Sequence, residues 1–490
     1  MKYIILILSV FSGITLSAQT FVDALRYSQF DFGGSARYQG TGGAMTALGA
    51  DFTSMSTNPA GLAVFRKSEL MVTPWVVGTT TSSTLQGSGN GSLTEEVLNF
   101  RLGNAGLVIA SNPGGKWTTV NFGIGLNRTA DYQQEFYFNG RGNGSIVDRF
   151  TAVADGLQPN ELDDFEGGLA FDAAAIYGPD ADGFYFSDMN SNANQNYSLT
   201  KSQFARQTGY SNELSFGLAG NYNEKLLIGV SLNVPFVRFT SNKEYIEEDP
   251  GNEVTNFNNL SFEEQLTASG SGFNAKLGLI YQPIHEVRIG ASIHTPSYLK
   301  FTEAFTNSLS YSYTEEGGSP TLGSADSPEG FFEYRLRTPW RYSGGVGTII
   351  KSFGFISADV EYVDYGSSSF KFVSSNIADI EYQRELNDAV DTRLQGALNL
   401  RLGAELALDI WRIRGGYMMY GSPYEGDSKF NTGFSLGAGF RANKFYVDLA
   451  YVRRGFDQIY QVYQIDDVNK PNVNQDIVRS NVALTVGFKI

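Results

Sequence analysis

The sequence predicts an all-β protein, a 14-stranded antiparallel transmembrane β-barrel with an N-terminal plug (hatch) segment inside its lumen. Many stretches alternate apolar and polar residues with a period of two, as a strand with one apolar face does. The connections between these stretches are alternately very short and long. After residue 18 no apolar run reaches the length of about 18 residues that a spanning helix needs. A closed barrel is then the remaining way to cross a membrane.

The first 18 residues have the order of a secretory signal peptide. Lys2 precedes an apolar run over residues 3–16, and Ser17-Ala18 supplies small residues for cleavage. We expect the mature chain to begin near Gln19, and the absence of a following Cys argues against a lipid anchor. The sequence contains 55 glycines, 27 tyrosines and 36 phenylalanines, and no cysteine. This composition suits glycine-spaced, aromatic-flanked strands better than a disulfide-stapled secreted domain.

The alternation is clear at the end of the chain, where Val482, Leu484, Val486 and Phe488 share one face of a predicted strand. The same reading places fourteen strands near residues 69–78, 103–111, 118–128, 211–222, 225–238, 271–282, 285–299, 339–350, 353–365, 396–408, 411–420, 432–441, 444–454 and 481–490. A count of about 12 or 16 stays open, since single-sequence strand assignments often fail.

Every second connection is only a few residues long, as at Asn223-Glu224 and Lys351-Ser352. The others are predicted as long loops over residues 79–102, 129–210, 239–270, 300–338, 366–395, 421–431 and 455–480. This alternation is typical of outer-membrane barrels, which have tight periplasmic turns and long outer loops. We assign the expected aromatic belt to Trp75, Trp340, Trp411, Tyr281, Tyr417, Tyr446 and Tyr451.

The pattern changes before the first strand. Residues 19–68 are rich in small residues and include Gly40-Thr41-Gly42-Gly43 and the tight-turn sequence Asn58-Pro59-Ala60-Gly61. A fourteen-stranded ring is too wide for its own side chains to fill. We therefore expect three parts: a signal peptide (1–18), an N-terminal plug or hatch (19–68) and the barrel (69–490).

With these motifs the chain resembles the FadL-type (FadL/TodX) family of outer-membrane transporters for long-chain fatty acids and hydrophobic compounds. The similarity continues in Thr338-Pro339-Trp340-Arg341, in Ala358-Asp359-Val360-Glu361-Tyr362, and in Leu402-Gly403-Ala404-Glu405 followed by Arg414-Gly415-Gly416-Tyr417. It implies capture of the ligand at the outer loops, movement of the plug and exit sideways into the membrane, with no energy source. The resemblance does not align well enough to assign lumen pocket residues.

Lateral exit in the family uses a kink in the third strand. The corresponding predicted strand contains Gly123 and Gly125, which would permit a bend. The alternative is that these are ordinary lumen-facing glycines.

Several large apolar residues fall in the predicted outer loops and are candidates for ligand capture: Phe257, Leu260, Phe262, Phe305, Phe331 and Phe332. They could equally form the internal packing of large loops.

No catalytic, metal or cofactor site is expected. Motifs for hydrolases, metalloproteases and nucleotide binding are missing, and the net charge of -15 argues against a nucleic-acid partner. Asp180, Asp182 and Asp188 lack the spacing of a calcium loop. His294 near Ser292 is the one pairing that a barrel lipase could use.

Together these features favour passive uptake of hydrophobic small molecules through a monomer in the outer membrane of a Gram-negative bacterium, among lipids and lipopolysaccharide. A second hypothesis stays open. A FadL-like barrel could act as an interaction partner of a protein-secretion apparatus without transporting a solute.

Overall fold

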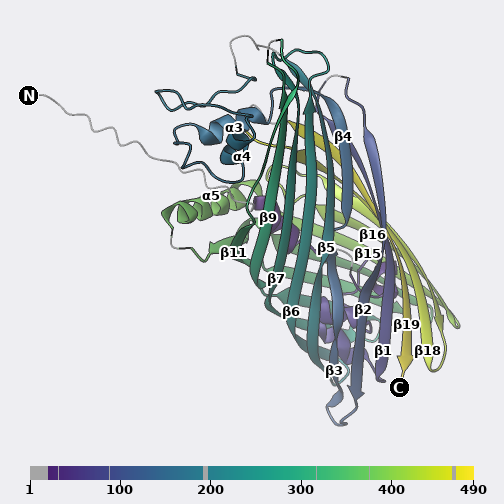
Figure 1. The fold of residues 1–490 in the computed structure, drawn as a ribbon. Coiled ribbons are helices and arrows are strands. Elements are labelled where there is room, and N and C mark those ends of the chain that lie inside the picture. The colour runs from purple at the N-terminus through teal and green to yellow at the C-terminus, as the bar shows by residue number, and fades with distance from the viewer. Residues whose placement is uncertain are drawn as a thin grey trace, which may run out of the picture.

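The structure is a computed structural model that describes residues 20–30, 33–87, 89–190, 197–315, 317–374, 376–465 and 471–490 (Figure 1). The expected signal peptide, residues 1–18, lies outside the described residues. None of the helices in the described part of the chain has both the length and the apolar character of a membrane-spanning helix.

Fourteen antiparallel strands form a closed wall, in which β19 pairs with β1 and completes the ring. These strands are β1 (Glu69–Leu85), β2 (Leu93–Ser111), β3 (Trp117–Asp131), β5 (Ser198–Tyr222), β6 (Leu226–Glu248), β7 (Phe257–Ile284), β8 (Val287–His294), β12 (Arg341–Ile350), β13 (Gly354–Asp364), β15 (Gly396–Leu408), β16 (Trp411–Gly421), β17 (Phe430–Arg441), β18 (Phe445–Gln461) and β19 (Asn472–Lys489). The predicted strand number and order are confirmed.

Four further strands continue wall strands beyond a break. They are β4 (Gln134–Asn143) after β3, β9 (Tyr298–Tyr313) after β8, β11 (Gly330–Arg337) before β12, and β14 (Ser369–Phe372) after β13. A last strand, β10 (Thr321–Asp326), pairs with β9 alone among the described residues.

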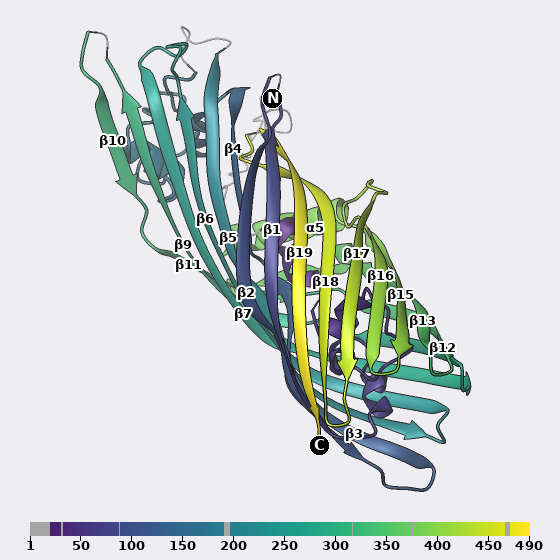
Figure 2. The same ribbon diagram turned by 90° about the vertical axis from the view of Figure 1, so that its right-hand side faces the viewer.

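The wall is much taller on one side than on the other (Figure 2). β7 has 28 residues, whereas β12 has 10, and about 9 to 11 residues suffice to cross a bilayer. Long parts of the predicted loops 79–102, 239–270, 300–338 and 455–480 are therefore strand, and their assignment as loops is wrong. Above the membrane neither face needs to be apolar, so runs such as Thr79-Thr80-Thr81-Ser82 lose the alternation on which the prediction relied.

The aromatic belt is confirmed in part. Trp340, Trp411, Tyr281 and Tyr417 are exposed on the outer face of the wall. Trp75 and Tyr446 are buried and point inward, which corrects their assignment to the belt.

The N-terminal segment lies inside the barrel, where its short helices are visible between the strands (Figure 2). It contains α1 (Phe21–Ser28), α2 (Ala36–Gly40) and the 3-10 helices η1 (Phe52–Ser56) and η2 (Pro59–Val64). Side chains cap these helices: Ser35 accepts a hydrogen bond from the Tyr38 N–H and Asp51 from that of Thr53. Residues of η1 and η2 form a buried cluster with Met71, Val108 and Ile280 of the wall.

Two caps close the lumen towards the end with the long connections. The outer cap comprises α3 (Val147–Ala154) and α4 (Gly167–Asp172), which pack against the tall strands. The second cap is α5 (Ile377–Arg393), whose Leu386 and Val390 lie in one cluster with Leu25 of α1. The short 3-10 helix η3 (Tyr365–Ser367) lies beside it.

Candidate functional site

Glycines on the inner face of the wall leave the space in which the N-terminal segment packs. A Cβ added at Gly106 or Gly125 would overlap the ring of Phe52, and one at Gly123 would overlap the Met55 sulfur. The β2–β3 ladder runs without a break past Gly123 and Gly125. These two glycines face the lumen and admit the N-terminal segment, and β3 has no register shift at them.

The sequence Asn58-Pro59-Ala60-Gly61 forms a tight corner of the segment. The Asn58 side chain donates hydrogen bonds to the carbonyls of Thr46 at 2.7 Å and Leu279 of β7 at 3.2 Å, and accepts one from the Ala60 N–H at 3.2 Å. The corner fits against wall glycines of β6 and β7, where an added Cβ would overlap it. Asn58 thus ties the segment both to itself and to the wall.

Buried ion pairs join the other side of the segment to the wall. Arg37 of α2 lies 3.2 Å from Glu405, which also pairs with Arg414 at 2.6 Å, and Arg414 pairs in turn with Asp448 at 2.7 Å. Glu405 and Arg414 belong to the two late motifs of the family resemblance. Other lumen cations are also paired, for example Arg401 with Glu361 at 2.9 Å.

The ladder between β2 and β3 is broken part of the way along these strands. Their ladder ends at Asn104 and Asn127, and residues 93–103 of β2 are then paired only with β1 among the described residues. Above that point β3 bulges between Arg128 and Ala130 and stays with β5. The Gln133 carbonyl then accepts a hydrogen bond from Thr79 on the inner face of β1 at 3.0 Å, so the chain has turned into the lumen.

This side gap lies at the height of the apolar band. Leu98 and Phe100 of β2 point outward beside it and are 72% and 70% exposed. Four polar side chains form contacts across the gap. Arg101 of β2 donates to Asp131 at 3.0 Å and to Gln133 at 3.1 Å, while Arg128 donates to the Leu102 carbonyl at 3.2 Å.

Two small cavities lie on the inner side of the gap, and Arg128 lines both of them. The first, of about 50 Å³, adjoins the N-terminal segment and is lined by Phe30, Tyr38, His294 and Arg401. The second, of about 30 Å³, is lined by Trp75, Val77, Ala130 and Val452. The Trp75 indole N–H is buried and has no hydrogen-bond partner within the described ranges, and it lies against Gly103 of β2.

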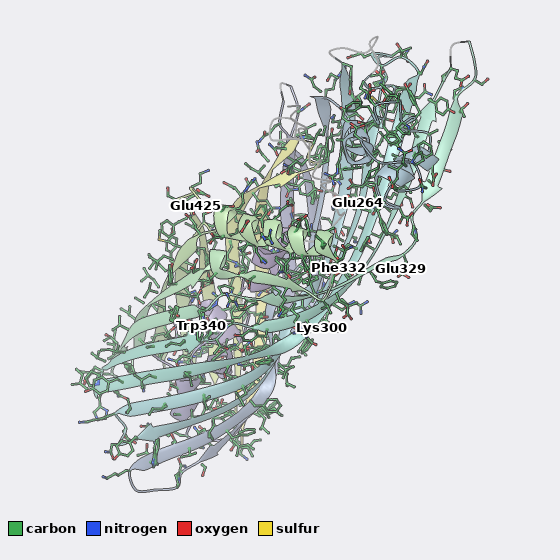
Figure 3. The ribbon with its side chains drawn as sticks, turned by 90° about the vertical axis from the view of Figure 1, so that its left-hand side faces the viewer. Glu264, Lys300, Glu329, Phe332, Trp340 and Glu425 are labelled. Atoms are coloured by element: carbon green, nitrogen blue, oxygen red, sulfur yellow. The ribbon has the colours of Figure 1, made fainter. Side chains whose placement is uncertain are left out.

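The predicted capture residues lie on strands rather than loops. Phe257, Leu260 and Phe262 of β7 are buried in the outer cap, which corrects their assignment as exposed loop residues. Phe305 of β9 packs against Phe165, with the two rings tilted and their centres 4.8 Å apart. Phe332 of β11 packs towards the α5 cap (Figure 3), and Phe331 is exposed on the outer face of β11.

A buried polar network fastens the outer cap. Glu247 of β6 accepts hydrogen bonds from the Ile146 N–H at 3.0 Å and the Tyr245 hydroxyl at 2.7 Å, and also from Ser145. In the same cap, burial raises the pKa of the Asp148 carboxyl, although the Ser145 N–H opposes that shift. The cap is therefore a packed structure with its own core.

Ser292 and His294 share the inner face of β8, as alternation predicts. His294 is buried and its Nε2 lies 2.6 Å from the Thr57 carbonyl of the N-terminal segment. That contact ties the imidazole to the N-terminal segment. No cluster of potential metal ligands occurs in the residues that the structure covers.

The close packing of the N-terminal segment on wall glycines predicts a specific mutant effect. Gly125→Val should push the ring of Phe52 out of its place, because the new side chain would occupy the same space. We expect protease sensitivity of the N-terminal segment to rise at least tenfold in the folded barrel, on the order of the 1–3 kcal/mol cost of overpacking. Gly344→Ala, where an added Cβ meets only Val360 at 3.7 Å, is the matched control. Equal cleavage in both variants would contradict the packing of the N-terminal segment on Gly125.

Solved structures share this architecture. A Pseudomonas aeruginosa FadL homologue matches with a TM-score of 0.60 at 12% identity, over 94% of this chain and 99% of its own. The Pseudomonas putida toluene transporter TodX matches with a TM-score of 0.52 at 13% identity, over 94% and 98% of the two chains. No protein-family model and no curated protein sequence matches. The chain therefore has the FadL-type fold, the fold that its resemblance to that family predicted.

Proposed function

We propose that this protein is an outer-membrane channel for the passive uptake of hydrophobic small molecules, such as long-chain fatty acids or aromatic hydrocarbons. The observation that carries the proposal is the side gap between β2 and β3, open at the height of the apolar band. A wall that served only as a scaffold would gain from a complete ladder there, since unpaired backbone groups facing lipid are costly. The similarity of the fold to the toluene transporter TodX supports the same reading.

The route that we propose begins between the outer cap and α5, where Phe305, Phe332 and Leu266 line the inner face of the tall strands. It continues through the two cavities and leaves through the side gap. The cavities have room for a few waters but not for a fatty acid. The N-terminal segment must therefore shift during passage. Gly33 packs so closely against the bend of β3 that an added Cβ would overlap the Arg128 carbonyl.

Passage of this kind needs no energy source. Each methylene group that leaves water for lipid gains about 0.8 kcal/mol. A sideways exit delivers the ligand directly into the lipid, so the ligand does not have to enter the aqueous space on the other side of the barrel. The function also places the chain in the outer membrane of a Gram-negative bacterium, as a monomer whose lumen is complete within one chain.

Uptake in cells tests the proposal. Deleting the gene should lower the uptake of labelled fatty acid or of an apolar aromatic compound, and a plasmid copy should restore it. Unchanged uptake of both ligand classes would refute transport. Stoichiometric protein partners on the purified barrel, together with unchanged uptake, would instead favour the role as a partner of a secretion apparatus.

A further inference from the structure

Three cations lie side by side on the outer face of the barrel wall, on β9, β11 and β14. Lys300 of β9 is directly opposite Arg335 of β11, which is directly opposite Lys371 of β14. All three side chains are exposed. We name Lys300, Arg335 and Lys371 the basic row. Because neighbouring strands are about 4.8 Å apart, the row extends over roughly 10 Å.

Such a row costs stability unless something neutralises it, since like charges directly opposite on adjacent strands repel. Lys300 pairs with Glu333 at 2.8 Å. Neither Arg335 nor Lys371 has an acidic partner within 4.0 Å in the described part of the chain. The chain as a whole carries a net charge of -15, so this concentration of positive charge is not a result of general composition.

The row lies directly above the aromatic belt. Tyr298 and Phe273, two residues below the row along the wall, stack with ring centres 5.4 Å apart on the outer face. Trp340 and Tyr342 form a second outward stack at 6.4 Å, in the wall that Figure 3 views with Lys300 and Trp340 labelled. Aromatic belts mark the level of the lipid headgroups. The long connections make this end of the barrel the outer one.

We propose that the basic row binds the phosphate groups of a phosphorylated glycolipid in the outer leaflet. Lysine and arginine donate charge-assisted hydrogen bonds to phosphate, and a length of roughly 10 Å can engage more than one phosphate of a headgroup. The stacked aromatic residues below would contact the start of its acyl chains. The inference rests on the outer-membrane placement proposed above, but it concerns the outer surface and not the transport path.

The test removes the row and counts bound lipid. The triple variant Lys300→Gln, Arg335→Gln, Lys371→Gln is purified in mild detergent, supplied with bisphosphorylated lipid A and measured by native mass spectrometry. We expect roughly a 5-fold loss of affinity per cation, so about 100-fold in all. The control triple Lys116→Gln, Lys225→Gln, Lys444→Gln removes the same charge from exposed positions at the short turns and should bind as the parent does.

Two further measurements make the outcome decisive. Dephosphorylated lipid A should bind the parent protein as weakly as the row variant binds the phosphorylated form, and inorganic phosphate alone should not displace the lipid. In lipid-free detergent the row variant should melt at the same or a higher temperature, since repulsion has been removed. Equal losses in both triples, phosphate-independent binding, displacement by inorganic phosphate or a lower melting temperature would each overturn the proposal. Uptake of hydrophobic ligands should not change, so this result is separate from the test of transport.

Discussion

Val77→Trp is expected to reduce the uptake of hydrophobic ligands at least tenfold while the barrel still folds. Val77 lies on the inner face of β1 and lines the cavity of about 30 Å³ behind the side gap. An indole at this position fills that cavity and places its ring between Ala130 and Val452, which line the same space. The ligand would then have no continuous path from the lumen to the gap.

The size of the effect follows from the steric barrier. Forcing a large group into a packed site typically costs 1–3 kcal/mol, and a ligand must displace the new ring as well. A barrier raised by about 1.4 kcal/mol slows passage tenfold. Reconstituted liposomes loaded with a fatty-acid-binding dye would report the rate directly, because ligand entering the membrane reaches the interior dye.

The neighbouring residue provides the matched control. Val76 lies on the same strand with its side chain on the opposite, lipid-facing side, so Val76→Trp adds the same volume outside the route. Uptake in that variant should equal that of the parent. If both variants transport at the parental rate although both are folded, the path does not run past Val77 and the side gap is not the exit.

Strand number and order could be predicted because the membrane imposes them. Lipid contact requires an apolar outer face, and the resulting alternation is visible in β19, where Val482 and Leu484 point outward. Above the membrane that requirement disappears, and the polar upper parts of β1, β6, β7 and β9 were mistaken for loops. The requirement for an apolar outer face applies only within the bilayer, so the strands were predicted accurately only there.

The site was less predictable, because it depends on contacts between distant segments. Gly123 and Gly125 were recognised as special, but their sequence gives no sign that Phe52 and Met55 would occupy the space above them. The true bend of β3 is marked by Arg128 and Asp131, two charged residues where a lumen-facing strand continues. That charge pair was a usable signal, and it was missed. The pairing of Glu405 with Arg414 could be anticipated only as a general matching of lumen charges.

The second large effect is expected for Asn58→Ala, which should turn the closed barrel into an ion-conducting one. The substitution removes the hydrogen bonds to the carbonyls of Thr46 and Leu279 and the cap on the Ala60 N–H. Each buried group left without a partner costs about 1–3 kcal/mol. A total near 3 kcal/mol would raise the population of a displaced N-terminal segment by about two orders of magnitude.

Single-channel recording in planar bilayers measures that population as the fraction of time spent conducting. Asn58→Asp should conduct at least as much as Asn58→Ala, because a buried carboxylate oxygen would face the carbonyls of Thr46 and Leu279, which are also acceptors. Asn112→Ala, at an exposed residue beside a short turn, should remain closed. Parental conductance in a folded Asn58→Ala protein would show that other contacts, such as the pair of Arg37 and Glu405, suffice to hold the segment.

The wall itself should survive this change, which makes the conductance readout clean. The fourteen-strand ladder closes through β1 and β19 without any contribution from the N-terminal segment, so its hydrogen bonds persist when the segment moves. The segment is instead held by side chains and by close packing on glycines, contacts that can be exchanged one at a time. The wall therefore does not depend on the segment, and the segment can move while the ring stays closed.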